Sequence, residues 1–337
     1  MRSAFGAGFD VPDGYLNTPS IGVPPTAVAD AVADAVDRWR AGAHTAGHFE
    51  PLVDRSRRGF ADLVGVPADR VAIGSAVAQL LVPVAAGLPE GARVLTAEGE
   101  FTSVTFPFAA RGARMTEVPV AELPGAVRGH DLVAVSVVQS ADGTAVDLDA
   151  LRAECDVAGV PVALDATQAA GWLPLSLDWA DWVVAAGYKW LLSPRGCAWL
   201  AVHPRAAGRT VPVGANWYAG EDPWQTTYGL PVRLAEGARR FDSSPVWFAH
   251  AGAAVALPYL ASLDLRAVRE HDATLADTLL TRLGLPERGS PIVALEADAG
   301  ALSRAGVVAS ARAGKARLGF HLYNTADDVE RVLDALS

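Results

Sequence analysis

The chain has 337 residues, enough for a large domain and a smaller one, and 51% of them are hydrophobic, so a substantial core can form. A formal net charge of −10 argues against a surface for nucleic acid or for an anionic membrane. We see no signal sequence, no run that could span a bilayer and, with only Cys155 and Cys197, no disulfide framework or zinc spacing, so we expect a cytoplasmic protein without a metal site.

Apolar runs and turns alternate along the chain and predict an α/β fold with a mostly parallel sheet. A first helix is expected from about Pro24–Pro25, and another over 147–157. The runs that predict strands are Val71–Ile73, Arg93–Leu95, Asp131–Val138, Pro161–Leu164 and Trp182–Ala186.

The turn after Val71–Ile73 is rich in small residues: Gly74-Ser75-Ala76-Val77-Ala78-Gln79. Small residues between a strand and a helix let backbone N–H groups reach an anion, and the helix dipole favours that anion. The same pattern is also typical of a simple helix cap by Ser75.

Two of the predicted strands deliver an ionisable residue at the C-terminal edge of the sheet, where ligands bind in open α/β folds. Pro161–Leu164 is followed by Asp165, and Trp182–Ala186 is followed by Gly187-Tyr188-Lys189-Trp190. Pyridoxal phosphate needs a lysine for its Schiff base and a carboxylate facing its pyridine nitrogen. Apolar neighbours also disfavour the charged form of a lysine and make its amine more nucleophilic. Taken singly, the aspartate is often a helix cap and the lysine is usually solvated.

Three motifs extend this pattern: Asp165-Ala166-Thr167-Gln168-Ala169, Tyr188-Lys189-Trp190-Leu191 and Pro194-Arg195-Gly196. Their order and spacing resemble the class V aminotransferase family of fold-type I pyridoxal phosphate enzymes. That family includes cysteine desulfurases, kynureninases, isopenicillin N epimerases and carbon–sulfur lyases. Similar landmarks run from Tyr15 to Asn324. The resemblance implies helices on both faces of the central sheet and three parts: an N-terminal arm (1–23), a large cofactor-binding domain (24–235) and a small C-terminal α/β domain (236–337).

The resemblance also implies roles around the cofactor. Lys189 would form the Schiff base, Asp165 would keep the ring nitrogen protonated, and Gln168 would hydrogen-bond the phenolic oxygen. The other expected cofactor-binding residues lie in loops: Ser75, Ala76 and Tyr188 at the phosphate, Phe101 stacked on the ring, Ser140 near the cofactor hydroxyl or the substrate, and Ser243 or Ser244 reaching the phosphate of the partner in a two-fold homodimer with shared active sites. The chain departs from the family at Ala76 and Ala186, where relatives carry hydroxyls.

An amino-acid substrate is implied in the same way. Arg317 matches the family arginine whose fork binds the α-carboxylate, although a surface salt bridge would give the same residue type. The remaining substrate-binding candidates are Ser20 and Ile21 in the arm, His44 in a loop that could simply be exposed, and Trp217 and Tyr218 in an aromatic stretch that could equally be interface packing.

The reaction is indicated by a residue type that is missing. Cysteine desulfurases carry a nucleophilic cysteine shortly before the matched arginine, and residues 306–317 contain none. We therefore expect a β-eliminating, carbon–sulfur lyase-like enzyme that acts without a catalytic cysteine. An aminotransferase or epimerase like the isopenicillin N epimerase branch is the alternative. A non-catalytic protein with the cofactor fold is a third possibility, supported only by Ala76 and Ala186.

Overall fold

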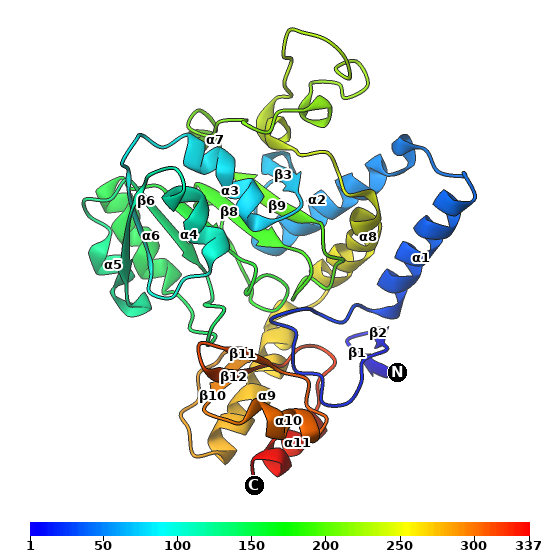
Figure 1. The fold of residues 1–337 in the computed structure, drawn as a ribbon, viewed down its shortest axis with the longest axis vertical. Coiled ribbons are helices and arrows are strands. Elements are labelled where there is room, and N and C mark those ends of the chain that lie inside the picture. Colours follow the sequence, from blue (N-terminus) through cyan, green and yellow to red (C-terminus); the bar gives the residue numbers. More distant parts are fainter.

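The computed structural model describes residues 1–337, apart from the side chain of Ala299. A seven-stranded sheet lies at its centre, built from β3 (Val71–Gly74), β4 (Arg93–Ala97), β5 (Arg114–Val118), β6 (Leu132–Ser136), β7 (Val162–Asp165), β8 (Trp182–Ala186) and β9 (Ala198–Val202). The strand order is β3-β9-β8-β7-β6-β4-β5 (Figure 1). All neighbours pair in parallel except β9, which is antiparallel to both β8 and β3. The predicted mostly parallel α/β sheet is confirmed.

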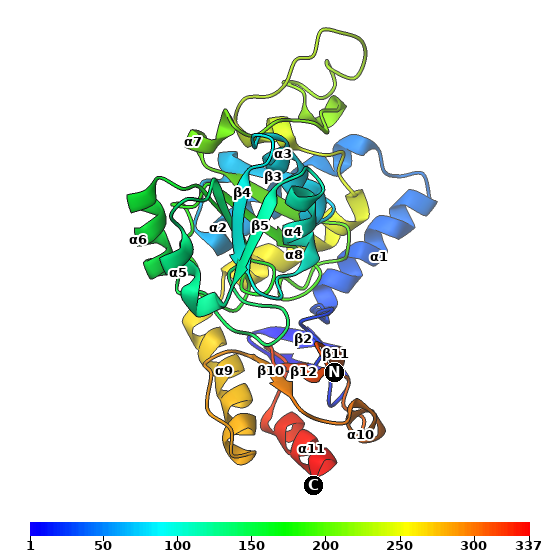
Figure 2. The ribbon, with the colours of Figure 1, turned by 60° about the vertical axis from the view of Figure 1, so that its left-hand side comes forward.

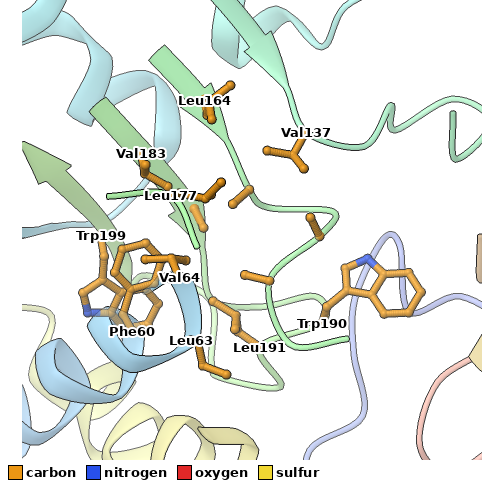
Figure 3. Packing of buried hydrophobic residues seen from close by; sticks show 14 of the residues in the cluster. Phe60, Leu63, Val64, Val137, Leu164, Leu177, Val183, Trp190, Leu191 and Trp199 are labelled. Atoms are coloured by element: carbon orange, nitrogen blue, oxygen red, sulfur yellow. The ribbon is translucent and has the colours of Figure 1, made fainter. Parts of the chain in front are cut away.

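Helices cover both faces of this sheet, so successive strand residues are buried in opposite directions. One face packs on α2 (Glu50–Val64) and α8 (Trp247–Ala261), and the other on α3 (Val77–Ala86) and α4 (Thr102–Ala109). Figure 3 shows the first contact, in which Phe60 of α2 stacks on Trp199 of β9 with ring centroids 5.5 Å apart. The sheet is therefore a rigid support for the loops at its ends.

The other helical segments are α1 (Thr26–Arg40), α5 (Leu123–Ala126), α6 (Leu148–Ala158), α7 (Pro204–Ala207), α9 (Leu265–Arg282), α10 (Ala299–Arg304), α11 (Ala326–Leu336), and the 3₁₀ turns η1 (Ala46–His48), η2 (Ala68–Arg70), η3 (Val120–Glu122), η4 (Trp217–Ala219) and η5 (Gly237–Phe241). Among the described residues, no single helix is long and apolar enough to cross a membrane. The bent pair α8 and α9, which meet at 92°, passes that test only when the two are taken together.

A second, smaller body lies below the main sheet (Figures 1 and 2). Its antiparallel sheet has the order β10 (Ile292–Leu295), β12 (Lys315–Gly319), β11 (Ser310–Arg312), and α9, α10 and α11 pack around it. The division expected between residues 235 and 236 stays a prediction. In the structure, α8 packs on α2 of the large body and α9 packs on α11, so the packing partners change between these two helices.

The N-terminal arm joins the two bodies. Its hairpin, β1 (Arg2–Ala4) and β2 (Ala7–Phe9), precedes single bridges from Tyr15 to Val308 and from Asn17 to Gly319 in the small body. A few residues later, the N–H of Gly22 donates to the carbonyl of Tyr188 in the large body at 2.9 Å. The arm therefore reaches the loop that carries Lys189.

Candidate active site

A pocket opens at the C-terminal ends of β6, β7 and β8, the edge expected for a ligand in this type of sheet. Eight residues predicted to bind the cofactor line it together: Ser75, Ala76, Phe101, Ser140, Asp165, Gln168, Tyr188 and Lys189. Their individual roles stay predictions, but the sheet brings them to one place.

Lys189 and Asp165 are both buried, with exposed fractions of 6% and 5%. Burial lowers the pKa of Lys189 to about 8, although the charge of Asp165 opposes this change. Burial likewise raises the pKa of Asp165 to about 6, against the hydrogen bond that its Oδ1 accepts from the N–H of Thr167 at 2.8 Å. The site therefore holds the amine of Lys189, which loses its proton near pH 8. It also holds the carboxyl group of Asp165, whose charge interacts with that amine.

Two glycines pack closely against backbone carbonyl groups of the loop that carries Lys189. A Cβ on Gly22 would lie 2.0 Å from the carbonyl oxygen of Lys189, and a Cβ on Gly171 would lie 2.6 Å from that of Trp190. Leu192 adopts a left-handed conformation with φ of 49°, which is uncommon for a residue with a side chain. These close approaches fix where the lysine leaves the loop.

Gln168 connects this loop to the N-terminal arm and to the loop that follows β6. Its Nε2 donates to Ser140 Oγ at 3.0 Å and to the carbonyl of Pro19 at 3.1 Å, and its Oε1 accepts from the indole N–H of Trp190 at 2.7 Å. These partners fix which end of the amide faces Ser140. The Gln168 amide therefore links the arm, the loop after β6 and the Lys189 loop.

Arg317 is 1% exposed, and every hydrogen bond that its guanidinium makes in the described structure is to a neutral group. Nε donates to Ser310 Oγ at 3.2 Å, Nη1 to the carbonyl and Oγ of Ser140 at 2.5 and 2.9 Å, and Nη2 to Ser20 Oγ at 2.8 Å. Burial, together with the charge of Arg312, lowers the pKa of Arg317 to about 10. A buried charge normally has an ionic partner, so this group is suited to receive a carboxylate. The surface salt bridge considered for Arg317 is not what the structure shows.

Phe101 is fixed by a buried carboxylate that no motif singled out. Glu100 accepts from the N–H of Phe101 at 2.7 Å, from the N–H and hydroxyl of Ser136 at 2.7 and 2.6 Å, and from Nε2 of Gln139 at 3.0 Å. The ring centroid of Phe101 lies 5.2 Å from Lys189 Nζ. Glu100 therefore positions the ring that is predicted to stack on the cofactor.

The end of the pocket at α3 can hold an anion without the hydroxyls that Ala76 and Ala186 lack. Among the described side chains none caps α3, and Ala76 and Val77 at its N-terminus line the pocket, so this helix end is available to an anion. The Ser75 hydroxyl donates to Gln79 Oε1 at 2.7 Å, which orients the turn. Polar pocket-lining residues to which the sequence patterns assigned no role are Ser103, Ser136, Thr167 and Arg195. The first three supply hydroxyls, and Arg195 could have been suspected from its place in Pro194-Arg195-Gly196.

Three candidates lie away from this pocket within the chain. His44 packs beside His48 and Phe49, with ring centroids 5.4 and 4.9 Å away. Ser243 contacts the carbonyl of Ile73, and Ser244 is exposed near it. Reaching a partner's site remains a prediction for all three.

The aromatic stretch lies outside this pocket within the chain, and its role at a substrate stays a prediction. Residues 221–233, most of them exposed, extend away from the sheet at the top of Figure 1. Tyr218 is only 6% exposed and belongs to the main core, with Trp217 packed against it at 5.3 Å, so neither lines the pocket. Both rings pack against the main core, because the turn η4 directs them inward. In the arm, Ser20 reaches Arg317, whereas Ile21 is 52% exposed and does not line the pocket.

Comparisons with known proteins agree with this geometry. The family described as aminotransferase class-V matches residues 24–289. The uncharacterized aminotransferase YcbU of Bacillus subtilis (strain 168) is 25% identical over 346 residues, which cover 93% of this chain and 91% of that protein.

Solved structures share the fold at lower identity. The cystine C–S lyase C-DES in complex with cysteine persulfide has a TM-score of 0.84 at 20% identity and covers 97% of each chain. The cysteine desulfurase CsdA of Escherichia coli has a TM-score of 0.84 at 18% identity, covering 97% of this chain and 95% of its own. A C-DES mutant has been solved with glycine covalently linked to its pyridoxal phosphate, with a TM-score of 0.82 at 20% identity over 97% of this chain and 96% of its own.

The cofactor is pyridoxal phosphate, and the pocket residues fit it. Lys189 offers a buried amine, Asp165 a buried carboxylate for a protonated ring nitrogen, and the N-terminus of α3 a place for a phosphate. The match over residues 24–289, most of the chain, assigns this enzyme to the class V aminotransferase family.

Proposed function

We propose that the enzyme catalyses β-elimination from an amino acid that carries a sulfur substituent on Cβ. The observation that carries this proposal is the turn before Arg317. Strands β11 and β12 are joined directly by Ala313 and Gly314, with φ of 47° and 79°, so the hairpin offers no thiol to receive sulfur.

Neither cysteine elsewhere in the chain substitutes for one. Cys155 and Cys197 are buried, and neither lines the pocket among the described residues. Burial raises the pKa of Cys155 to about 12 and also raises that of Cys197, which disfavours the reactive thiolate. Release of sulfur as a small thiol is then simpler than its transfer to the protein.

Different residues would carry out different parts of the reaction. Arg317 binds the α-carboxylate and so fixes the amino acid relative to Lys189. Pyridoxal phosphate, when bound, supplies an electron sink for the electrons left at Cα. The amine of Lys189, with a pKa of about 8, is suited to remove the Cα proton near neutral pH.

The products follow from the bonds that change. Lys189 Nζ takes the Cα proton, and the Cβ–S bond breaks with its electron pair moving to sulfur, which leaves as a thiol after protonation. The three-carbon remainder is 2-aminoacrylate, which reacts with water to give pyruvate and ammonia. No oxidant or reductant is consumed.

Transamination is the second candidate, because the Bacillus relative is described as an aminotransferase. Incubation of the loaded enzyme with S-substituted cysteines distinguishes the candidates. Elimination releases pyruvate, ammonia and thiol in equal amounts over many turnovers. Transamination gives one equivalent of keto acid and stops until a second keto acid is added, and epimerisation changes only the Cα configuration. Keto acid without thiol release would refute the elimination.

A catalytically idle protein is less well supported. We expect the hydroxyl of Ser103, which lines the pocket, to offset the hydroxyls missing at Ala76 and Ala186, whereas the hydroxyls of Ser136 and Thr167 are engaged by Glu100 and by the N–H of Ala186. We also propose that the enzyme forms a two-fold homodimer, in which Ser243 or Ser244 lies at the phosphate of the partner's cofactor. We propose a cytoplasmic location for it. Analytical ultracentrifugation tests the dimer.

A further inference from the structure

One face of the β11–β12 hairpin carries a row of cations beside the pocket. Arg317 pairs with Ser310 across the two strands, and Arg312 pairs with Lys315. Directly opposed residues share a face of an antiparallel pair, as do residues two apart in one strand. The bond from Arg317 Nε to Ser310 Oγ confirms that face, and Arg317 points from it to Ser140 in the pocket. Arg312 and Lys315 therefore continue the row outward from Arg317.

Of the two outer cations, Lys315 has a carboxylate partner and Arg312 has none in the described structure. Lys315 lies 3.1 Å from Glu296 and is an ordinary exposed ion pair. Arg312 is exposed, and the one hydrogen bond that its guanidinium makes in the described structure is from Nη1 to the carbonyl of Ala311 at 2.7 Å. Within the described structure no carboxylate lies in salt-bridge distance of Arg312.

Other charged groups around the pocket leave an excess of positive charge. The charges of Arg317, Arg312 and Arg195 all lower the pKa of Lys189, and Arg195 lines the pocket. Glu100 is engaged by four donors, and Asp165 faces Lys189. If Arg317 takes the α-carboxylate and Arg195 assists the cofactor phosphate, the positive charge of Arg312 still has no anion.

We propose that Arg312 binds a second anionic group, at the far end of the substrate side chain. The preferred substrate is then a β-substituted amino acid whose leaving group carries a carboxylate or a comparable anion. Ser310 touches Arg317, and Arg312 lies two residues further along β11, a span of roughly 7 Å. That span suits a side chain with a few atoms between the two anionic ends. The anion site rests on the proposed function only for the position of the α-carboxylate at Arg317, and the statement about the leaving group rests on the proposed elimination as well.

Calorimetry on the pyridoxal phosphate-loaded enzyme tests this without any turnover. Glutarate offers two carboxylates, and its monoamide offers one in the same shape. We expect glutarate to bind about tenfold more tightly to the wild type, as for one added ion pair of about 1.4 kcal/mol. In Arg312→Gln this preference should fall to within about twofold. The matched control is Arg304→Gln, which removes one exposed positive charge from α10 of the same small body and should keep the preference.

The outcomes separate this inference from the proposed function. An equal preference for glutarate in Arg312→Gln and the wild type, or no preference in the wild type, would overturn the role of Arg312. Arg312 lies in an exposed hairpin, so its replacement should leave the thermal unfolding temperature unchanged. That measurement shows that the variant is folded. If glutarate behaves as expected but no S-substituted cysteine releases thiol, the second anion site stands and the elimination is wrong. Equal kcat/KM for S-carboxymethylcysteine and its amide, with thiol released from both, would refute the substrate class alone.

Discussion

The ionisation of Lys189 can be measured directly, because the chain contains only two lysines, Lys189 and Lys315. The structure lowers the pKa of Lys189 from 10.5 to about 8, mainly through burial. That change corresponds to about 3 kcal/mol of penalty on the charged amine. At pH 7 about one molecule in ten would carry neutral Lys189, against roughly one in 3,000 for an ordinary lysine.

Methylation of both lysines with ¹³C-formaldehyde in the cofactor-free protein gives two lysine signals for NMR. We expect one to titrate with a midpoint near pH 8, and the variant Lys315→Arg to retain it. The sign follows from the lowered pKa: the amine is charged below the midpoint and neutral above it. Cofactor attachment, which needs the neutral amine, should accelerate about tenfold per pH unit up to about pH 8 and then level off.

Asp165→Asn refines the same experiment, because the charge of Asp165 raises the pKa of Lys189. Its loss should move the midpoint to lower pH. A Lys189 signal that titrates with the ordinary lysine midpoint of 10.5 would refute the reasoning, since it would mean that the amine is hydrated. A midpoint that rises in Asp165→Asn would show that the carboxylate does not act on Lys189 as described.

Three further changes test other parts of the structure. Arg317→Gln should weaken substrate binding about 100-fold, with cofactor loading unchanged, because a buried charged hydrogen bond is lost; equal affinity in a spectral titration would contradict this. Trp190→Phe leaves the Oε1 of Gln168 without its donor and should cost about 1–3 kcal/mol in urea unfolding, and an unchanged midpoint would argue against the bond. Asp242→Asn breaks the buried pair with Arg57, at 2.8 Å, and should cost about 3–5 kcal/mol, whereas a loss below about 1 kcal/mol would mean that water reaches the pair.

The strands that carry the site were predictable because they are short, apolar and bounded by turns. Trp182–Ala186 has the same bounds in the structure, and Asp165 ends β7 as expected. The direction of β9 was not predictable, because an apolar run does not encode whether it pairs in parallel. The role of α8 is similar: it is apolar all round, so periodicity could not tell which elements it would contact.

Within the site, residues in the turns directly after strands could be placed, and residues in longer connections could not. Asp165 and Gln168 reach the pocket because the sheet fixes where their strand stops. Trp217 and His44 lie in connections whose course depends on packing and, if the dimer forms, on another subunit. Glu100 was missed because a carboxylate beside a strand end has the same sequence signal whether it is buried or solvated.

The pocket is assembled from all three parts of the chain, and this couples binding to their docking. Arg317 of the small body bonds Ser140 of the large body and Ser20 of the arm. Nearby, His321 bonds Asp272 at 2.9 Å and the carbonyl of Trp190 at 3.2 Å. Because that carbonyl can only accept, Nε2 of His321 must carry a proton, and a second proton must lie between Nδ1 and the carboxylate. The small body thus holds the Lys189 loop through a neutral buried pair, and any ligand bound at Arg317 adds its binding free energy to this docked arrangement.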